Sequence, residues 1–493
     1  MTEIVEQLSL WGEMYPFFHF NDKPIILLEM FAGIGAQRKA FEILGVKIDD
    51  RQSKICEWAY NSYCAYNSIH LKDWTDYSLG KSKEELVKKV FGTSINYDEP
   101  LSFEQVNKKP LEWLKSAYNN IIATNNLVNI MEVQGKDLGE LPSDQVSILT
   151  YSFPCQDLST AGKLGGMSTS QKDGGTRSGL LWEVERILME RERDGLQLPT
   201  ILMMENVEQV VGKNNIKHFK KWEQRLRQFG YSNYVDTLNG KNFGIPQSRK
   251  RCFMISILGE YAYDFPCKIK LRHKLRDVLE NNVDEKYFLS DDFIDYASGV
   301  NYDNAKFNRT KMFISKLKTT NVDGIAGTIT TREGGRSNDN FIVEDESLKK
   351  ELCNQLIKDG LVKEGDIVKH SYTSQIMNGK KKAVETSDEM ITLTTRGDCL
   401  GVVVDDNKIM SIKNLRIRKL TPKECMRLMG FADSDTQALR DIDLSDAAIY
   451  HVAGDSIITT CLVALFSSFV NNKNEHISII EKYVEENIVE KRR

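Results

Sequence analysis

Tyr151-Ser-Phe-Pro-Cys-Gln-Asp-Leu-Ser159 is the stretch around which the rest of this 493-residue chain is organised. The apolar and β-branched run 147–152 is typical of a buried parallel strand. Pro154 ends that strand, because proline has no N–H to donate to a sheet ladder. Cys155 therefore falls at the carboxyl end of a strand, where open α/β sheets bind their ligands. A buried structural thiol is the alternative interpretation, and the other motifs decide between the two.

The bulk composition is that of a soluble globular protein with room for two or three domains. Hydrophobic residues make up 41% of the chain, charged residues make up 28%, and the formal net charge is −4. The nine cysteines contain no C-x-x-C pair, so we predict neither a zinc site nor a disulfide framework and expect a reducing cytoplasm. We also expect no signal peptide and no membrane span, since no run of roughly 18 apolar residues occurs. Basic clusters at 268–276 and 416–419 are either nucleic-acid contacts or solvated faces.

A glycine-rich turn follows the first predicted strand, residues 24–30. Gly33 and Gly35 lie between this strand and a predicted helix at 37–44, where glycine lets the backbone approach a ligand closely. A lone G-x-G is weak evidence, and a tight strand-to-helix turn without a ligand explains it equally well. Residues 160–179 are also rich in glycine, and their composition predicts a mobile lid.

Two further strand ends bring polar side chains to the same edge of the predicted sheet. Glu57 follows the second strand about 20 residues after the glycines, a position suited to ribose hydroxyls, and Trp58 offers an aromatic face for a base. Glu205 and Asn206 end the strand 199–207, and a buried glutamate needs a partner or stays protonated. Arg249 and Arg251 lead into the strand 252–257 and alternate with period 2, so both are expected on one side. The intervening segment 73–131 has a helical pattern without evident chemistry, which predicts an insertion.

The pattern changes beyond residue 261. Residues 261–415 are rich in turns and charges and contain a weak repeat, Gly327-Thr-Ile-Thr-Thr-Arg332 and Ile391-Thr-Leu-Thr-Thr-Arg396. Paired β-elements that present Thr and Arg suit a polyanion, although paired strands of a small sheet would look the same. After them, 420–430 predicts a helix with Thr421 and Glu424 as a capping box.

Together these motifs resemble, in order, those of the cytosine-C5 DNA methyltransferase family of bacterial or phage restriction-modification type. They are Phe31-Ala-Gly-Ile-Gly35, Pro154-Cys-Gln156, Glu205-Asn-Val207, Gln247-Ser-Arg-Lys-Arg251, Arg418-Lys-Leu-Thr-Pro-Lys-Glu-Cys-Met-Arg-Leu-Met-Gly-Phe431 and Gly454-Asp-Ser456. The resemblance covers nearly the whole chain apart from 73–131 and the C-terminal tail. It implies an α/β fold, a Rossmann-like S-adenosylmethionine-dependent methyltransferase domain with a smaller, β-rich target-recognition domain inserted before the C-terminal motifs. The corresponding expectation is a catalytic domain at 1–260, a recognition domain at 261–415 and a return to the catalytic domain at 416–493.

The resemblance also implies a mechanism. Cytosine C5 is a poor nucleophile, so Cys155 adds to C6 and turns C5 into an enamine carbon. Glu205 stabilises the charge that develops at N3, Arg251 holds the base O2, and Arg249 braces the loop near Cys155. The target cytosine must leave the duplex to be reached.

The implied methyl donor is S-adenosylmethionine, and no metal is implied. Its expected contacts, carried over from the family motifs, are Phe31, Gly33, Gly35, Glu57 at the ribose, Trp58 and Asp137 at the adenine, Pro154, Asp455 and Ser456. Two positions depart from the family pattern, because Lys136 breaks the usual glycine–acid pair and Asp455 stands where the family often has Asn. Expected substrate contacts are Gln156, Ser159, Asn206, Gln247, Arg332 and Arg396.

The implied partner is double-stranded DNA, with a cognate restriction endonuclease acting on the same site and a monomeric enzyme in the cytoplasm. One alternative is a tRNA cytosine-C5 methyltransferase, which the size of 261–415 disfavours because that branch has a short recognition segment. The other is a catalytically silent DNA-binding regulator, which the presence of Cys155, Glu205 and both arginines disfavours.

Overall fold

The computed structural model describes most of the chain outside the region 289–416. The described residues are 15–97, 99–154, 177–288, 317–318, 322–331, 333, 340–343, 394–395, 403–405, 408–409, 417–470 and 475–490. Five predicted site residues lie outside them, namely Cys155, Gln156, Ser159, Arg332 and Arg396. Residues 160–176, most of the predicted lid, lie outside them as well.

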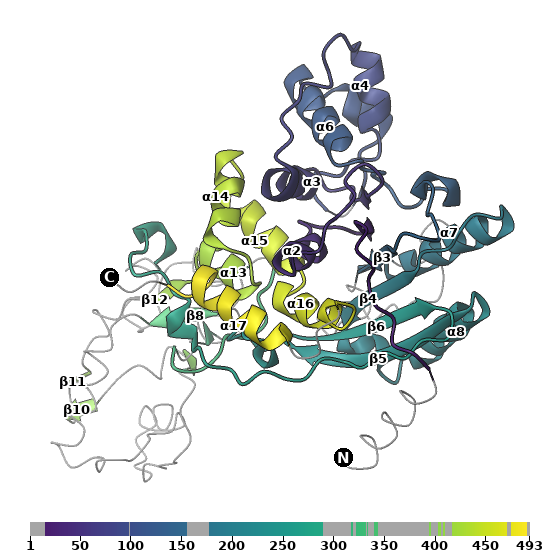
Figure 1. The fold of residues 1–493 in the computed structure, drawn as a ribbon. Helices are drawn as coiled ribbons and strands as arrows, with labels where there is room; N and C mark the ends of the chain where they lie inside the picture. The colour runs from purple at the N-terminus through teal and green to yellow at the C-terminus, as the bar shows by residue number, and fades with distance from the viewer. Residues whose placement is uncertain are drawn as a thin grey trace. The chain divides into compact units, whose positions relative to one another are not determined.

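A six-stranded sheet in the order β2-β1-β3-β4-β6-β5 forms the centre of the fold (Figure 1). The strands are β1 (Ile26–Met30), β2 (Lys54–Cys56), β3 (Ser147–Tyr151), β4 (Ile201–Val207), β5 (Tyr231–Asn239) and β6 (Lys250–Leu258). The adjacent strands β2, β1, β3 and β4 are parallel to one another, whereas β6 runs antiparallel to both β4 and β5. The carboxyl ends of β1, β2, β3 and β4 therefore meet at one edge, as the sequence predicted, and the α/β prediction is confirmed.

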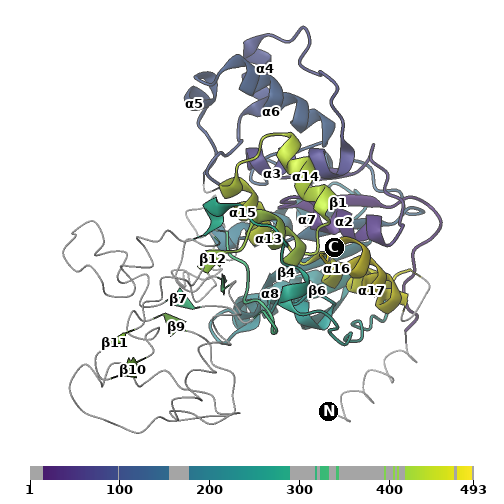
Figure 2. The ribbon, with the colours of Figure 1, turned by 90° about the vertical axis from the view of Figure 1, so that its left-hand side faces the viewer.

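Helices cover both faces of this sheet. On one face, α7 (Leu181–Arg193) and α8 (Ile216–Gln228) pack their apolar residues onto alternate strand residues in a continuous core that includes Trp222. On the other lie α2 (Ala36–Ile43), α16 (Thr459–Ser467) and α17 (Glu475–Asn487) (Figures 1 and 2). There Phe41 stacks on Phe466 with ring centroids 4.3 Å apart, which joins the C-terminal helices to the first strand-to-helix unit.

The apolar C-terminal segment belongs to this core. Residues Asp446–Ser467, which include α15 (Asp446–Asp455) and α16, are the one run among the described residues that is long and apolar enough to cross a membrane. However, 89% of its most apolar window is buried inside the protein. Burial of this extent is what a core helix requires, so the hydropathy is explained by packing.

The segment 73–131 is helical, as its pattern predicted. It contains α4 (Lys83–Val90), α5 (Phe103–Asn107) and α6 (Leu111–Ala123), which lie together near α3 (Tyr60–Tyr66) (Figures 1 and 2). Their apolar residues form a second core that also contains Ala32 and Ile55. This second core therefore reaches the glycine-rich turn after β1 and the end of β2.

The chain divides into two compact units. Unit 1 comprises 1–245, 249–271 and 429–488, and unit 2 comprises 246–248, 272–428 and 489–493. Unit 2 contains the short strands β7 (Leu317–Lys318), β8 (Phe341–Val343), β9 (Thr394–Thr395), β10 (Val403–Asp405), β11 (Lys408–Ile409) and β12 (Ile417–Lys419), together with the helix α13 (Pro422–Leu428). These strands pair antiparallel as β12–β8, β7–β9 and β10–β11.

The described part of unit 2 contains a capped helix, α13, with a buried ion pair at its start. The Glu424 N–H donates to Thr421 Oγ1 at 3.1 Å, and the Thr421 N–H donates to Glu424 Oε2 at 2.8 Å, which confirms the predicted capping box. Both Glu424 oxygens also accept from the Arg418 guanidinium at 2.8 and 2.9 Å, and both side chains are almost fully buried. Burial raises the pKa of Glu424, while Arg418 and the backbone donors oppose that rise.

Removing Arg418 should destabilise unit 2 strongly. Arg418→Ala leaves the Glu424 carboxyl buried without its cation, which costs about 3–5 kcal/mol of unfolding free energy. The matched control is Lys423→Ala, which removes a partly exposed pair with Glu280 and should cost about 0–1 kcal/mol. Urea titration of both variants gives the comparison, and equal losses would contradict a special role for the buried pair.

Candidate active site

The turn after β1 is shaped for close approach by a ligand. Phe31, Gly33 and Gly35 all have positive φ, at 61°, 55° and 78°. A Cβ at Gly35 would lie 2.6 Å from the side chains of Tyr66 and His70, so only glycine fits there. A Cβ at Gly33 would meet nothing within 4 Å, so the turn is open on that side.

Glu57 ties this turn to the end of β2. Its side chain is 9% exposed, and its two oxygens accept from the Gly33 N–H at 2.8 Å and the Ala59 N–H at 2.9 Å. Burial raises the Glu57 pKa to about 7, against the lowering effect of those two backbone donors. A carboxylate has about four lone-pair positions, so acceptor capacity remains for a ligand. Trp58, partly buried, packs against the second core.

The end of β3 is held by Asn206. The Asn206 Nδ2 donates to the Phe153 carbonyl at 2.9 Å, and its Oδ1 accepts from the Val207 N–H at 2.8 Å. The amide, 2% exposed, thus fixes the backbone that leads into Pro154 and the Cys155 position. Through these bonds Asn206 positions the backbone, and the substrate contact expected for Asn206 stays a prediction.

A buried ion pair stands at the carboxyl end of β4. Glu205 is 7% exposed, and its Oε1 lies 3.1 Å from Arg251 Nε on β6. Burial raises the Glu205 pKa, while Arg251 and, after it, Arg249 oppose the rise. The structure therefore brings the two predicted base-binding residues into direct contact.

Arg249 reaches a different part of the chain. Its Nη2 donates to the Gly454 carbonyl at 2.8 Å and to the Ser456 carbonyl at 2.9 Å. Arg249 thus braces the Gly-Asp-Ser motif, and its expected contact with the loop near Cys155 lies outside the described residues. Between these two carbonyls, Asp455 projects an exposed carboxylate whose Oδ2 lies 3.1 Å from His451 Nδ1.

Two predicted residues are engaged elsewhere. The Asp137 carboxylate, in the 3-10 turn Gly135–Leu138, accepts from the Gln134 N–H at 2.8 Å. Gln247 belongs to unit 2, where it donates to the Leu428 carbonyl at 2.6 Å and accepts from the Ile329 N–H at 3.2 Å. The ligand contacts expected for both residues stay predictions.

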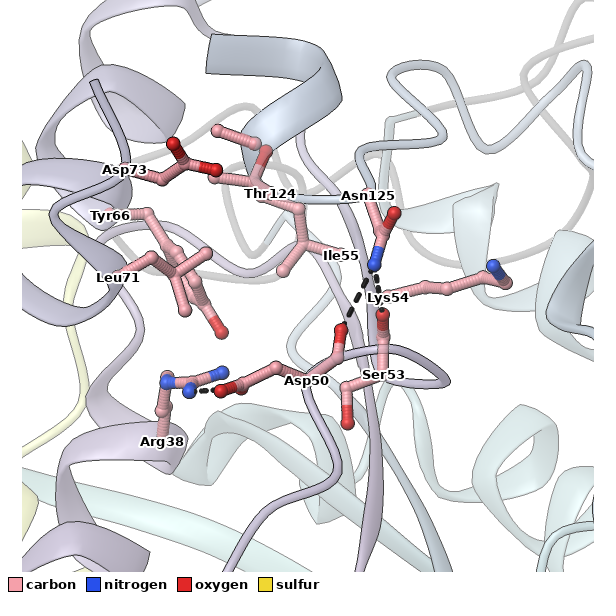
Figure 3. Close-up of a pocket in the computed structure, with 11 residues that line it drawn as sticks. Arg38, Asp50, Ser53, Lys54, Ile55, Tyr66, Leu71, Asp73, Thr124 and Asn125 are labelled. Carbon is pink, nitrogen blue, oxygen red and sulfur yellow. Dashed lines mark hydrogen bonds and ion pairs between the residues drawn. The ribbon is translucent and has the colours of Figure 1, made fainter. Parts of the chain in front are cut away.

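A separate small pocket of about 190 Å³ lies beside α2 and β2 (Figure 3). Arg38 pairs with Asp50 at its wall, and the Tyr66 hydroxyl donates to the buried Glu29 carboxylate at 2.5 Å. None of the residues predicted to bind cofactor or substrate lines it. In the described part of the chain, no group of three or more His, Cys, Asp or Glu is arranged to hold a metal ion.

The fold is that of a methyltransferase. The methyltransferase EhMeth of Entamoeba histolytica superposes with a TM-score of 0.51 at 16% identity, covering 91% of this chain and 98% of the other. The Dnmt2 methyltransferase of S. pombe gives 0.50 at 14% identity, covering 91% and 98%.

Sequence comparison narrows this class to one family. Residues 103–471 match the family described as C-5 cytosine-specific DNA methylase. The orphan methyltransferase M.SssI of Spiroplasma monobiae is 35% identical over 298 residues, which are 60% of this chain and 73% of that protein. The type II methyltransferase M2.ScrFI of Lactococcus lactis subsp. cremoris is 34% identical over 308 residues, or 60% and 81%. The chain belongs to the C-5 cytosine-specific DNA methylase family, which confirms the resemblance of its motifs.

The family uses S-adenosylmethionine as methyl donor, and the residues present fit this cofactor. The open side of Gly33 admits a ligand to the turn after β1. Glu57 is a buried carboxylate with unused acceptor positions beside that turn, as ribose hydroxyls require. These two features stand together at the carboxyl edge of the sheet.

Cofactor affinity should fall at acid pH through Glu57. With a pKa of about 7, Glu57 is ionised above pH 7 and protonated below it, and protonation removes acceptor capacity from the ribose contact. We expect calorimetric affinity for S-adenosylmethionine to drop as the pH is lowered from 8 through 7 to 6. Glu57→Gln should bind at least several-fold more weakly at pH 8, since a charge-assisted hydrogen bond is worth about 1.5–3 kcal/mol. It should also show a flatter pH profile, and identical profiles for both proteins would refute the assignment.

Proposed function

We propose that this protein is a sequence-specific DNA (cytosine-5-)-methyltransferase that acts on a flipped cytosine with Cys155 as its nucleophile. The observation that carries the proposal is the buried Glu205–Arg251 pair, which lies at the carboxyl edge of the sheet in a chain of the cytosine-C5 family. Asn206 anchors the β3 end that leads to Cys155 from the strand that also carries Glu205. A polar base-binding pair and a nucleophile position thus follow neighbouring strand ends.

Cys155 opens the reaction by adding its sulfur to C6 of cytosine. The thiolate is the attacking form, and a free thiol has a pKa of about 8.5, so a nearby cation must favour ionisation. The new C6–S bond pushes the electron pair of the C5–C6 double bond toward N3 and O2. S-adenosylmethionine, when bound, would supply the methyl group to C5, its S–CH3 bond breaking to leave S-adenosylhomocysteine. Loss of the C5 proton to water would then expel the Cys155 sulfur and restore the ring.

Glu205 and Arg251 receive the charge that this addition displaces. Burial favours the protonated Glu205, which donates its proton toward N3. Arg251 now lies 3.1 Å from Glu205, and its expected contact with the base O2 would draw it from that carboxyl. Losing the cation raises the Glu205 pKa further, which strengthens the acid when the base is bound.

The cofactor supplies an electrophilic methyl group. On the protein side, Glu57 binds the ribose hydroxyls and Trp58 stacks on the adenine. Phe31, Gly33, Gly35, Pro154 and Ser456 shape the remaining wall, with Asp137 at the adenine edge and Asp455 nearby. These assignments follow the family motifs and the strand-end positions described above.

Unit 2 is proposed as the region that reads the DNA sequence. Its described strands are short antiparallel pairs, which suits a β-rich target-recognition domain at 261–415. DNA is the substrate that the family implies, and we propose the double-stranded form. The type II relatives support a cognate restriction endonuclease, whereas the orphan relative supports a solitary enzyme. We propose a monomer that works inside the cell, in the cytoplasm where bacterial or phage DNA is methylated.

Trapping on 5-fluorocytosine tests the nucleophile. Bisulfite sequencing of DNA from expressing cells first gives the recognition site. Wild type with S-adenosylmethionine and a duplex carrying 5-fluorocytosine at that site should then form an adduct stable in denaturing gels, since no C5 proton can leave. Cys155→Ser should form almost none, because an alcohol is a far weaker nucleophile at neutral pH. Cys267→Ser, which changes an exposed free cysteine, is the matched control and should trap like wild type.

Other outcomes of that assay identify the alternatives. Near wild-type methylation by Cys155→Ser would exclude Cys155 as nucleophile. Wild-type binding without an adduct would favour the silent DNA-binding regulator. Methyl transfer to tRNA rather than duplex DNA would favour the RNA-directed enzyme.

Arg332 and Arg396 are proposed to face DNA. If one binds guanine, its alanine variant should relax specificity at one base pair, whereas loss of a phosphate contact should weaken all sites evenly and lower the salt slope by about 1. Arg193→Ala, at the exposed end of α7, serves as the control. Salt-dependent binding measurements separate these results, and unchanged binding and specificity in both variants would leave the repeat a structural element.

A further inference from the structure

The segment 73–131 holds the backbone that presents Glu57. Asn126, 2% exposed, accepts from the Glu57 N–H through Oδ1 at 3.0 Å and donates through Nδ2 to the Glu57 carbonyl at 2.8 Å. One amide therefore fixes the peptide groups on both sides of the ribose-binding carboxylate. The Leu127 N–H also donates to the Ile55 carbonyl at 2.8 Å, so 126–127 extends the edge of the sheet beside β2.

A second contact of this segment fixes Trp58. The Ser94 N–H donates to the Trp58 carbonyl at 2.7 Å, and the Tyr60 N–H donates to the Ser94 carbonyl at 2.9 Å. Ser94 is fully buried, so these bonds are shielded from water. The residues predicted to bind ribose and adenine are thus both held by backbone contacts from 73–131.

A third contact reaches Asp455 through His451. The Tyr97 ring stacks on the His451 imidazole with centroids 3.6 Å apart and planes at 11°. His451 stands one helical turn before Asp455 on α15, and its Nδ1 lies 3.1 Å from the Asp455 carboxylate. Tyr97 has φ +64°, an uncommon backbone conformation for a residue other than glycine.

Tyr97 lies near the cofactor edge, which is the name used here for the turn after β1, Glu57 at the end of β2, and Asp455. Burial raises the pKa of its phenol to about 12; the Asn61 side chain acts against that rise, and the Asp455 and Glu57 carboxylates add to it. Within the described residues, the buried hydroxyl makes no hydrogen bond of normal geometry. Asp455 also adds a negative charge near Glu57, and this charge contributes to the raised Glu57 pKa, whereas His451 opposes it.

We propose that the segment 73–131 is a positioning element for S-adenosylmethionine, in which Asn126 sets Glu57 and Tyr97 holds His451 against Asp455. The inference rests on the proposed function. A carboxylate must be placed within a fraction of an ångström to bind two ribose hydroxyls, and Asn126 provides that placement. The His451 imidazole lies beside the carboxylate that stands where the family often has a neutral Asn, and it offsets that charge when it is protonated.

Binding measurements on four variants test this role. Asn126→Asp keeps the acceptor for the Glu57 N–H but loses the donor to its carbonyl, and Tyr97→Leu removes the ring stack. Each should weaken calorimetric binding of S-adenosylmethionine about fivefold or more, the equivalent of one lost interaction of about 1 kcal/mol, with the KM for DNA unchanged. Tyr97→Phe should bind S-adenosylmethionine with near wild-type affinity, because the phenylalanine ring still stacks on the His451 imidazole. Phe103→Ala, on the exposed face of α5, is the matched control and should bind like wild type.

A double-mutant cycle tests the link to Asp455. His451→Gln should weaken cofactor binding in the wild-type background and have little effect in Asp455→Asn, where there is no charge to offset. Equal effects in both backgrounds would overturn the role of His451.

Two results would overturn the proposed role of the segment 73–131. Folded Asn126→Asp and Tyr97→Leu variants that bind cofactor with wild-type affinity overturn the proposal. So does a rise in the KM for DNA alone, which would assign the segment to the nucleic acid. Tyr97 is half-buried, so its variants carry the test if Asn126→Asp melts early. A wild-type protein that binds no S-adenosylmethionine would instead defeat the proposed function, and this inference with it.

Discussion

The hydrogen bond from the Gly33 N–H to the Glu57 carboxylate is the contact on which the cofactor edge depends. It joins the turn after β1 to the end of β2, next to the backbone bond that the Phe31 N–H donates to the Cys56 carbonyl at 2.9 Å. A buried carboxylate is unfavourable without donors, and the N–H groups of Gly33 and Ala59 supply two. The remaining cost of burial appears as a Glu57 pKa raised to about 7.

A second buried carboxylate, Glu205, stands at the carboxyl end of β4, where we propose that the target base binds. Glu205 and Arg251 pair with each other on antiparallel strands, and both are proposed to bind the target base. Asn206 and Arg249, next in sequence or two positions away, spend their hydrogen bonds on backbone carbonyls at Phe153, Gly454 and Ser456. Glu205 and Asn206 are neighbours on β4, so their side chains point to opposite faces of the sheet. Arg249 precedes β6, and its side chain reaches Gly454 and Ser456 from there. Reactive and supporting residues therefore arise from the same short motifs.

The helical segment 73–131 supports the residues at the ends of β1 and β2. Its apolar core includes Ala32 and Ile55, so it is packed onto the cofactor edge as well as inserted into the chain. Ser94 and Tyr97 lie between α4 and α5, and Asn126 follows α6, in irregular stretches where no periodic pattern or motif singles them out. Their importance follows from contacts alone.

Local sequence determined where the main strands lie, which polar residues follow their carboxyl ends, and the family to which the chain belongs. β1, β3 and β4 appear where apolar runs met Gly, Pro or carboxylate residues, and the Thr421–Glu424 cap was readable from spacing. These features depend on neighbours a few residues apart, so the sequence suffices for them. Tertiary structure alone decided that Arg249 holds Gly454 and Ser456, more than 200 residues away, and that Asn126 holds Glu57. It also placed Gln247 in unit 2 rather than with its sequence neighbours Arg249 and Arg251. Such pairings are set by how distant segments pack in three dimensions, and no local pattern encodes them.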